Sequence, residues 1–400
     1  MEALALYVHD NFLYQAPIWL ASAVVQFVIA GIVLMVFVSP VAGLLSFVER
    51  RIAARIQDRV GPNRVGPQGI LQFLADGIKS LLKEDLIPRD ADKPLFILAP
   101  YLVFLGMFTT FVALPFSGVL IVADLNVGIL YIFATSSLTV VGLVMAGWSS
   151  GNKWSMLGGM RSAAQVISYE IPAGLAALTV ILLTGSLSMQ NLVMGQGAYP
   201  WQWYIFNNPF CLVAFFVLFI SLVAEGNRTP FDLPEAESEL VSGYNTEYSG
   251  MRFVFFFFAE WANLYVMGAI LTVLFLGGWQ IPQGWTDAAL RIATWTPTVV
   301  QTLVFLVKSF WIVFIVIQLR WTVPRIRMDQ LMSLCWKYLV PIGFACVMGV
   351  AVWMMIWPKG VDWMRYLLTA LAALTTVYYF YRVVWQLKNT RAELQFNPLV

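Results

Sequence analysis

Long apolar stretches alternate with short polar loops along almost the whole chain. A helix needs about 20 mostly apolar residues to cross the hydrocarbon core of a bilayer. Continuous apolar runs, rather than ten-residue segments of alternating polarity, argue against a transmembrane barrel. The pattern predicts an all-α polytopic membrane protein, one bundle in one domain. Its nine predicted spans are residues 17–48, 94–116, 127–148, 163–186, 208–224, 253–278, 298–319, 338–357 and 363–381.

Composition and charge placement agree with this pattern. Hydrophobic residues make up 60% of the 400 residues, and charged residues only 12%. Twenty of the 24 Lys and Arg residues fall in loops on one side of the predicted bundle and three on the other, while Lys308 lies within a span. The positive-inside rule places the basic side in the cytoplasm. We therefore expect the N-terminus outside and the C-terminus inside.

The chain offers few ligands for a metal or a cluster. It has one histidine, His9, and three cysteines with no C-x-x-C pair. Metal and iron–sulfur sites need several such side chains close together. We therefore expect no metal, flavin or iron–sulfur group to be held by this chain alone.

The first charged loop continues the first predicted helix beyond the membrane. Arg51, Arg55 and Arg59 fall on one face of that helix. Membrane anchoring explains most of these arginines but leaves Glu49, at the interface, without a reason. Residues 69–84 then predict an amphipathic helix lying in the interface. That helix is either a surface strut or the wall of a chamber open to lipid.

Residues 224–250 are the most acidic part of the chain. Six carboxylates and one arginine lie there between two apolar runs. Prolines and apolar residues are interspersed with the acids, unlike a solvated tail. This loop predicts proton or cation chemistry at the membrane surface. The three arginines of residues 320–332 are, by contrast, interpreted as ordinary anchoring.

Four ionisable residues lie in or at the ends of predicted spans: Glu170, Glu225, Glu260 and Lys308. Such residues are costly in a membrane and are most often functional, with structural pairing as the alternative. At helical rise, Glu170 and Glu260 lie roughly 10–12 Å deep and Lys308 roughly 18 Å deep. With the acidic loop they predict a graded proton route. Pro172 is expected to open the helix beside Glu170.

Four long strings carry a family resemblance: ERRIAARIQDRVGPNRVGP, FLADGIKSLLKED, AEGNRTPFDLPEAESELVSGYNTEYSG and RWTVPRIRMDQLM. Together, and in this order, they resemble the family of H subunits of NADH-quinone oxidoreductases. That family is the bacterial counterpart of subunit 1 of mitochondrial complex I. The resemblance implies an eight-helix core within residues 1–357. Residues 358–400 are then a C-terminal extension with one more predicted helix.

The resemblance also implies partners and a site. A quinone chamber, for ubiquinone or menaquinone, would be shared with peripheral subunits, one of which holds the terminal iron–sulfur cluster. Small membrane subunits would link the chain to antiporter-like subunits. The chain would also contact lipid, and it would bind no nucleic acid. The implied chamber and entrance residues are Glu49, Arg50, Arg59, Asp76, Arg228, Phe231 and Asp232. The implied proton-coupling residues are Glu235, Glu237, Glu239, Glu225, Glu247, Glu170, Glu260 and Lys308.

We therefore expect a subunit of a respiratory complex in the bacterial cytoplasmic membrane that couples quinone reduction to proton translocation. One alternative is the equivalent subunit of a related complex that takes electrons from ferredoxin, coenzyme F420 or a hydrogenase-type module. A more distant alternative is a self-sufficient secondary transporter. Transporters usually contain two repeats with broken helices, and this sequence has no visible repeat.

Overall fold

The computed structural model describes residues 39–233, 241–290, 293, 295–357 and 360–396, together with residues 24, 28 and 31, and only the backbone at 288 and 387–396. All regular structure in these residues is helical, which confirms the all-α prediction. The long helices are α3 (Ser39–Ile56), α5 (Lys93–Thr110), α6 (Gly128–Ser149), α7 (Lys153–Thr184), α9 (Pro209–Glu225), α11 (Gly250–Phe275), α13 (Thr296–Thr322), α15 (Val340–Ile356) and α16 (Asp362–Phe396). Shorter helices are α4 (Gln72–Leu82), α8 (Met189–Met194), α12 (Gln283–Leu290) and α14 (Met328–Ser333).

The helices follow the apolar runs of the sequence closely. Seven helical segments in the described residues are long and apolar enough to cross a membrane, and α9 is a shorter apolar helix. These account for eight of the nine predicted spans. Most of the first predicted span, residues 17–48, lies outside the described residues. Its last part corresponds to the beginning of α3. The chain is thus a multi-pass membrane protein.

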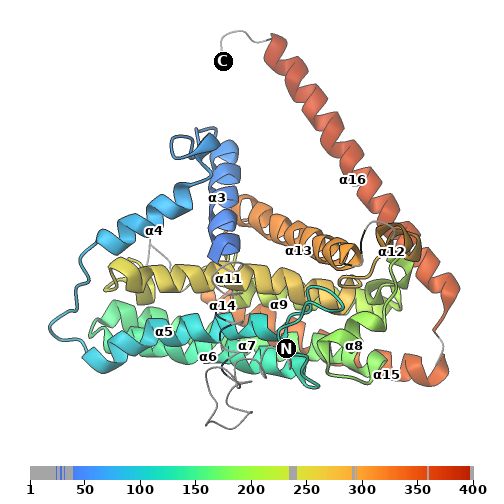
Figure 1. Cartoon of the computed structure of the whole chain (residues 1–400), viewed down its shortest axis with the longest axis horizontal. Coiled ribbons are helices and arrows are strands. Elements are labelled where there is room, and N and C mark those ends of the chain that lie inside the picture. Colours follow the sequence, from blue (N-terminus) through green and yellow to red (C-terminus); the bar gives the residue numbers. More distant parts are fainter. Residues whose placement is uncertain are drawn as a thin grey trace.

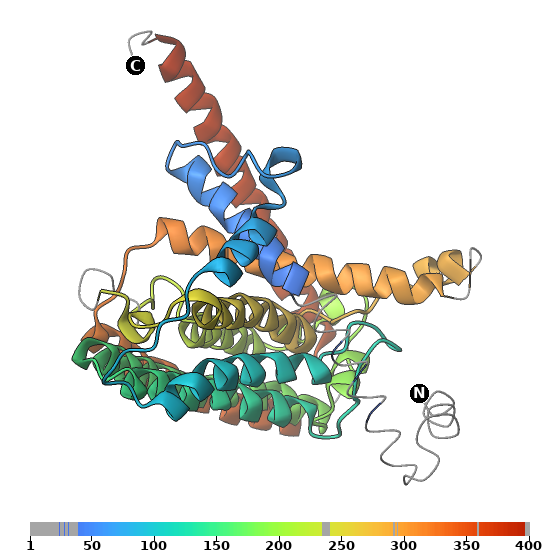
Figure 2. The same cartoon turned by 60° about the vertical axis from the view of Figure 1, so that its left-hand side comes forward.

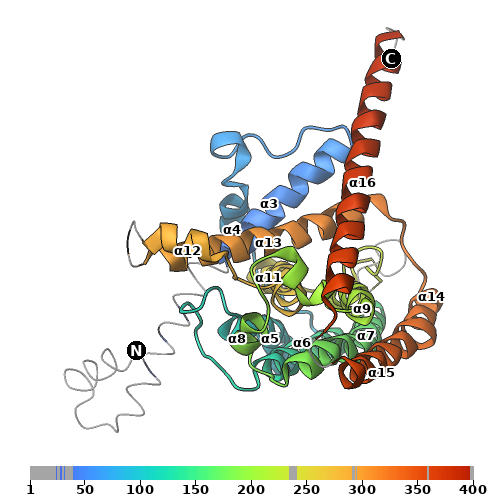
Figure 3. The same ribbon diagram turned by 90° about the vertical axis from the view of Figure 1, so that its right-hand side faces the viewer.

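The central bundle consists of helices that run side by side. Helices α5, α6, α7 and α11 lie lengthwise in Figure 1 and are seen nearly end-on in Figure 3. In the contacts between neighbours, α6 packs on both α5 and α7, while α9 packs on α7 and α11. Helix α11 is buried along most of its length, because neighbours surround it. It therefore forms the axis of the molecule.

Three helices lie together on one side of this bundle, as Figure 2 shows: α3, α4 and α13. Helix α13 crosses α11 obliquely rather than running parallel to it (Figures 1 and 3). The amphipathic α4 packs against α3 and α11. Gly43 permits the close approach of α3 to α4, because a Cβ atom there would overlap the ring of Phe73. This side layer and α11 enclose the space described below.

Helix α7 is continuous through Pro172, so the prediction that this proline opens the helix is wrong. Proline lacks the N–H that would bond the carbonyl of Ser168 four residues earlier. The thiol of Cys335 donates to that carbonyl instead, over 3.1 Å. Cys335 belongs to a π-helical turn, Leu334–Leu339, between α14 and α15. The freed carbonyl is therefore satisfied by a neighbouring helical turn.

The C-terminal α16 diverges from the bundle (Figures 1 and 3). Its contacts lie at its base, where Arg365 donates to Asn207 Oδ1 over 3.0 Å from Nε and 2.8 Å from Nη2. The ring of Tyr366 lies 6.4 Å from that of Trp201. Within the part of the chain that the structure describes, no side chain of its apolar window is buried.

Candidate functional site

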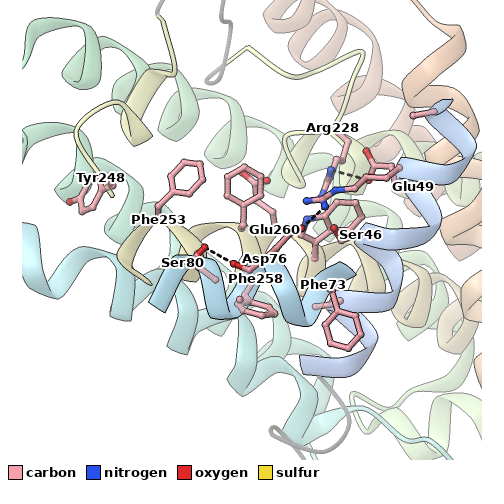
Figure 4. Close-up of a pocket in the computed structure, with 18 of the residues that line it drawn as sticks. Ser46, Glu49, Phe73, Asp76, Ser80, Arg228, Tyr248, Phe253, Phe258 and Glu260 are labelled. Atoms are coloured by element: carbon pink, nitrogen blue, oxygen red, sulfur yellow. Dashed lines mark hydrogen bonds and ion pairs between the residues drawn. The ribbon is translucent and has the colours of Figure 1, made fainter. Parts of the chain in front are cut away.

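A cavity of about 600 Å³ lies where α3, α4, α11 and α13 meet the loop before α11 (Figure 4). This is the size of a pocket for a cofactor-sized ligand. Its apolar walls include Phe73 of α4 and Phe253 and Phe258 of α11. Charged side chains from α3, α4, α11 and α13 also line it, so the cavity is amphipathic.

One ion pair joins two helices at the cavity wall. Arg50 of α3 pairs with Asp76 of α4, and Gln72 also donates to Asp76 over 3.0 Å. Both ionic side chains are well exposed, so the pair contributes little net free energy of folding. Arg59, beyond the end of α3, also lines the cavity. The predicted entrance residues Arg50, Arg59 and Asp76 therefore lie together.

A cluster of one buried carboxylate, one buried arginine and one partly exposed arginine lines the cavity. Glu49 is 4% exposed and pairs with Arg320 of α13, and its Oε2 lies 3.5 Å from Nη1 of Arg228. Buried charges are tolerated only when they are paired. The two arginines supply the reason for Glu49 that the sequence lacked. The interpretation of Arg320 as a simple membrane anchor was therefore wrong.

Arg228 lies over an aromatic ring. Its guanidinium carbon lies 4.4 Å from the centroid of Trp261, and the residue is only 4% exposed. Its Nε and Nη2 groups donate no hydrogen bond to any described residue. Buried donors normally have an acceptor. These N–H groups, on a residue that lines the cavity, are suited to an acceptor oxygen of a bound molecule.

Glu260 lies in the wall between two cavities. It lines the large cavity and also a second one of about 30 Å³, which Glu225 lines from α9. The hydroxyl of Tyr244 donates to Glu260 Oε1 over 2.9 Å. A cavity of this volume has room for about two water molecules. The predicted coupling residues Glu225 and Glu260 are thus brought to one hydratable space.

Asp232 lies in the acidic loop near three arginines and a glutamate. Its Oδ1 is 4.0 Å from Nη2 of Arg325. Burial raises the pKa of Asp232 to about 6, Arg325 opposes that rise, and the charge of Glu260 adds to it. A carboxyl with this pKa changes its charge near neutral pH. Arg325, too, therefore has a partner in the site and was wrongly interpreted as an anchor alone.

The remaining predicted residues are spread over several places. Phe231 is buried, with its ring 5.6 Å from that of Tyr169. Glu170 lies on α7 with a buried Oε1 that accepts no hydrogen bond from the described residues. Glu247 accepts from Asn152 over 2.8 Å at a separate surface concavity. Glu235, Glu237 and Glu239 lie outside the described residues.

Lys308 lies apart from these carboxylates. Its amine donates to the carbonyls of Leu276 and Gly278, over 2.8 and 3.1 Å, and lies 4.7 Å from the ring of Trp203. Leu276 follows the C-terminal end of α11, sixteen residues beyond Glu260, or roughly 24 Å along a helix. Lys308 therefore caps the far end of the helix that carries Glu260.

Sequence reasoning missed several residues of the site: Tyr244, Trp261, Arg320, Arg325 and the buried Gln165 of α7. The two arginines fell in a loop whose charge pattern is typical of anchoring. Tyr244 lay inside the acidic loop string but carried no charge to attract attention. A lone glutamine or tryptophan in an apolar helix gives no periodic signal.

Comparison with known proteins gives a consistent result. The family model described as NADH dehydrogenase matches residues 28–351. The H subunit of the NADH-quinone oxidoreductase from Anaeromyxobacter dehalogenans is 52% identical over 348 residues, covering 85% of this chain and 83% of that protein. The H subunits from Chlorobaculum parvum and Geobacillus thermodenitrificans are 47% and 45% identical, over 76% and 86% of this chain and 86% and 98% of their own lengths.

Proposed function

Because this chain belongs to the family of NADH-quinone oxidoreductase H subunits, we propose that its large cavity is the membrane part of a quinone-binding chamber and that Glu260 begins a proton route from it. A member of this family is a membrane component of complex I, an oxidoreductase. The chain thus takes part in electron transfer as one subunit of a larger enzyme.

The chemistry of the cavity supports a quinone as the occupant. A quinone has an apolar tail and a ring with two carbonyl oxygens. Phe73, Phe253 and Phe258 supply apolar surface for the tail. The Nε and Nη2 groups of Arg228 donate no hydrogen bond to a described residue, so they can serve as donors for a quinone carbonyl oxygen. The amphipathic α4, with exposed leucines along its outer face, supports entry of the quinone from the lipid.

One observation carries the coupling proposal: Glu260 borders both the chamber and the small cavity of Glu225. Electrons from a peripheral subunit add negative charge to the quinone, and protons must follow. Protonation changes at Asp232 and Glu260 would then be passed through the small cavity to Glu225 and on to Glu170. We place Glu235, Glu237, Glu239 and Glu247 in the same acidic loop as further proton-exchanging groups.

The proposed surroundings follow from the same assignment. The basic loops and the chamber would face the cytoplasm of a bacterium, where peripheral subunits dock, one of them carrying the terminal iron–sulfur cluster. The N-terminus would lie on the opposite side. Small membrane subunits that lead to antiporter-like subunits would continue the proton route beyond Glu170. Residues 1–357 form the family core in this proposal, and α16 an addition to it.

The test uses the whole complex, purified and also reconstituted into vesicles. Glu260→Gln and Glu225→Gln keep the shape of the side chains but remove the exchangeable carboxyl proton. We expect assembled complex in normal amount, with quinone reduction and proton translocation both lowered about tenfold or more. Asp287→Asn, at an exposed position of α12, is the control and should change neither. Wild-type values for both measurements in both glutamine variants would refute the proposed route.

A further inference from the structure

Gln165 is a buried amide in the middle of α7 with three acceptors around one nitrogen. It has no exposed surface. Its Nε2 lies 2.8 Å from the carbonyl of Ala224, 2.7 Å from that of Phe231 and 3.1 Å from Oδ1 of Asn227. An amide nitrogen carries two hydrogens, so the three acceptors share them. This side chain is not among the residues that line either cavity of the proposed site.

The positions of these acceptors along the chain indicate which segments the contact joins. We call residues 224–233 the Arg228 turn. Ala224 lies at its start, next to Glu225, and Phe231 near its end, next to Asp232. Gln165 itself precedes Glu170 by five residues on the same helix. One side chain therefore ties the backbone beside two acidic residues to the helix that carries a third.

We propose that Gln165 is a positioning residue for proton coupling: it holds both ends of the Arg228 turn on α7 and so fixes Glu225 and Asp232 relative to Glu170. This inference rests on the proposed function and adds to it a residue that neither donates nor accepts the transferred proton. A shift of the turn when its acidic groups change charge is then passed directly to α7.

The other half of the amide distinguishes Gln165 from Gln196, a second buried glutamine. Gln165 Oε1 is buried and accepts no hydrogen bond from the described residues. Gln196, which is also buried but lies at the opposite end of the bundle, forms hydrogen bonds with both its amide nitrogen and its amide oxygen. Its Nε2 donates to Val273 over 2.8 Å, and its Oε1 accepts from the N–H of Gly277 over 2.8 Å.

Gln196 thus provides a matched control for an experiment on the whole complex. Gln165→Leu and Gln196→Leu each remove one buried amide of the same size. For Gln165→Leu we expect quinone turnover per assembled complex to fall roughly tenfold, because small displacements of reacting groups are costly. For Gln196→Leu we expect less assembled or less heat-resistant complex, but turnover within about twofold of wild type per assembled complex, since the change acts on stability alone.

The pH profile gives a readout that packing alone does not move. Four charged groups face Asp232: Arg325, Glu260, Arg320 and Arg228. Burial is the main cause of its raised pKa, so a loosened Arg228 turn hydrates the carboxyl and lowers that pKa. The inflection of quinone turnover near pH 6 should therefore move to lower pH in Gln165→Leu and stay in place in Gln196→Leu.

Gln165→Glu keeps the test decisive if the leucine variant does not assemble. A carboxylate cannot donate to Ala224 or Phe231, whereas a protonated carboxyl can donate once. Turnover of this variant, relative to wild type at the same pH, should therefore recover as the pH is lowered. Equal turnover and an equal pH profile in the Gln165 variants, the Gln196 variant and wild type would overturn the inference. If Glu260→Gln and Glu225→Gln still stop proton translocation in that case, the proposed function stands without it.

Discussion

The two ends of α11 carry similar buried polar groups but satisfy them differently. At the C-terminal end, Gln196 bonds Val273 and Gly277, and Lys308 bonds Leu276 and Gly278. A cation beside the last carbonyls also suits the helix dipole. At the N-terminal end, around Glu260, the buried oxygens Glu225 Oε2, Gln165 Oε1 and Asp232 Oδ1 receive no hydrogen bond from the described residues.

This difference distinguishes the end of α11 that supports the fold from the end that we propose to act in coupling. The bonded side chains of Gln196 and Lys308 hold one geometry, although the indole N–H groups of Trp203 and Trp279 at the same end donate to no described residue. Unpaired buried donors and acceptors cost about 1–3 kcal/mol each, and near Glu260 they are the titratable carboxylates themselves and the amide beside them. The two cavities lie at the N-terminal end of α11 and none of their lining residues belongs to the C-terminal cap. We therefore expect the same helix to be anchored at one end and functional at the other.

The largest effect is expected from the cluster of Glu49, Arg228 and Arg320 near the N-terminal end of α11. Glu49→Gln leaves Arg228 and Arg320 without their anionic partner. Breaking a buried pair costs about 3 kcal/mol or more, which corresponds to roughly 100-fold in rate if it is expressed at the site. Quinone turnover of the assembled complex measures this.

The matched change at the other end of the bundle is Asp362→Asn. Asp362 pairs with Arg365 over 3.4 Å, but its side chain is 81% exposed. An exposed pair contributes little, so turnover should stay within about twofold of wild type. Similar losses in Glu49→Gln and Asp362→Asn would contradict the distinction between the two ends.

A smaller effect, but one with a clear pH signature, is expected from Asp232→Asn. Burial raises the pKa of Asp232 to about 6, so the wild-type group is protonated below that pH and ionised above it. Turnover measured from pH 5 to 8 should lose its inflection near pH 6 in the variant. At pH 7 we expect a loss of about fivefold, because the partly exposed pair with Arg325 contributes about 1 kcal/mol.

The same raised pKa predicts the direction of a stability change. The folded protein binds the Asp232 proton more tightly than the unfolded chain, whose aspartates have a pKa of about 3.9. This group therefore stabilises the fold at low pH, and its contribution is lost as the pH rises from about 4 to 6. Asp232→Asn should remove that pH dependence. An unchanged inflection in both turnover and heat resistance would show that Asp232 is not the titrating group.

The smallest effect on turnover is expected at the capped end. Lys308→Met removes the bonds to Leu276 and Gly278 and should make the complex easier to inactivate by heat. Turnover per assembled complex should change less than about twofold, with an unaltered number of protons translocated per electron. The sequence-based prediction that Lys308 takes part in coupling remains open to this measurement. A lowered proton-to-electron ratio would favour it and would weaken the comparison of the two ends.

The fold was largely predictable because the bilayer imposes a simple rule on every span. Each apolar run had to become a helix, and the bounds of α6, α9 and α11 differ from the predicted ones by only a few residues. Depth along the membrane was less predictable. The estimate for Lys308 counted residues along α13 as if it ran parallel to the bundle, whereas α13 crosses obliquely and its lysine reaches the end of α11.

The site was predictable where charge made residues conspicuous and not where pairing decided their role. Glu49 and Arg320 are 271 positions apart, and no local pattern links them. The acidic loop was evident, but the amide that fixes it lies on another helix, about 60 residues earlier, in an apolar run. Contacts over such distances depend on how helices pack, which a single sequence states only indirectly.

The attachment of α16 has a consequence for how such chains change over time. The matched family region ends at residue 351, and the helix after it is fixed by Arg365 and a ring contact at its base. An element joined at so few points can be gained, shortened or lost in a lineage without any core side chain having to be replaced. The working part of the molecule can therefore stay constant while its periphery diversifies.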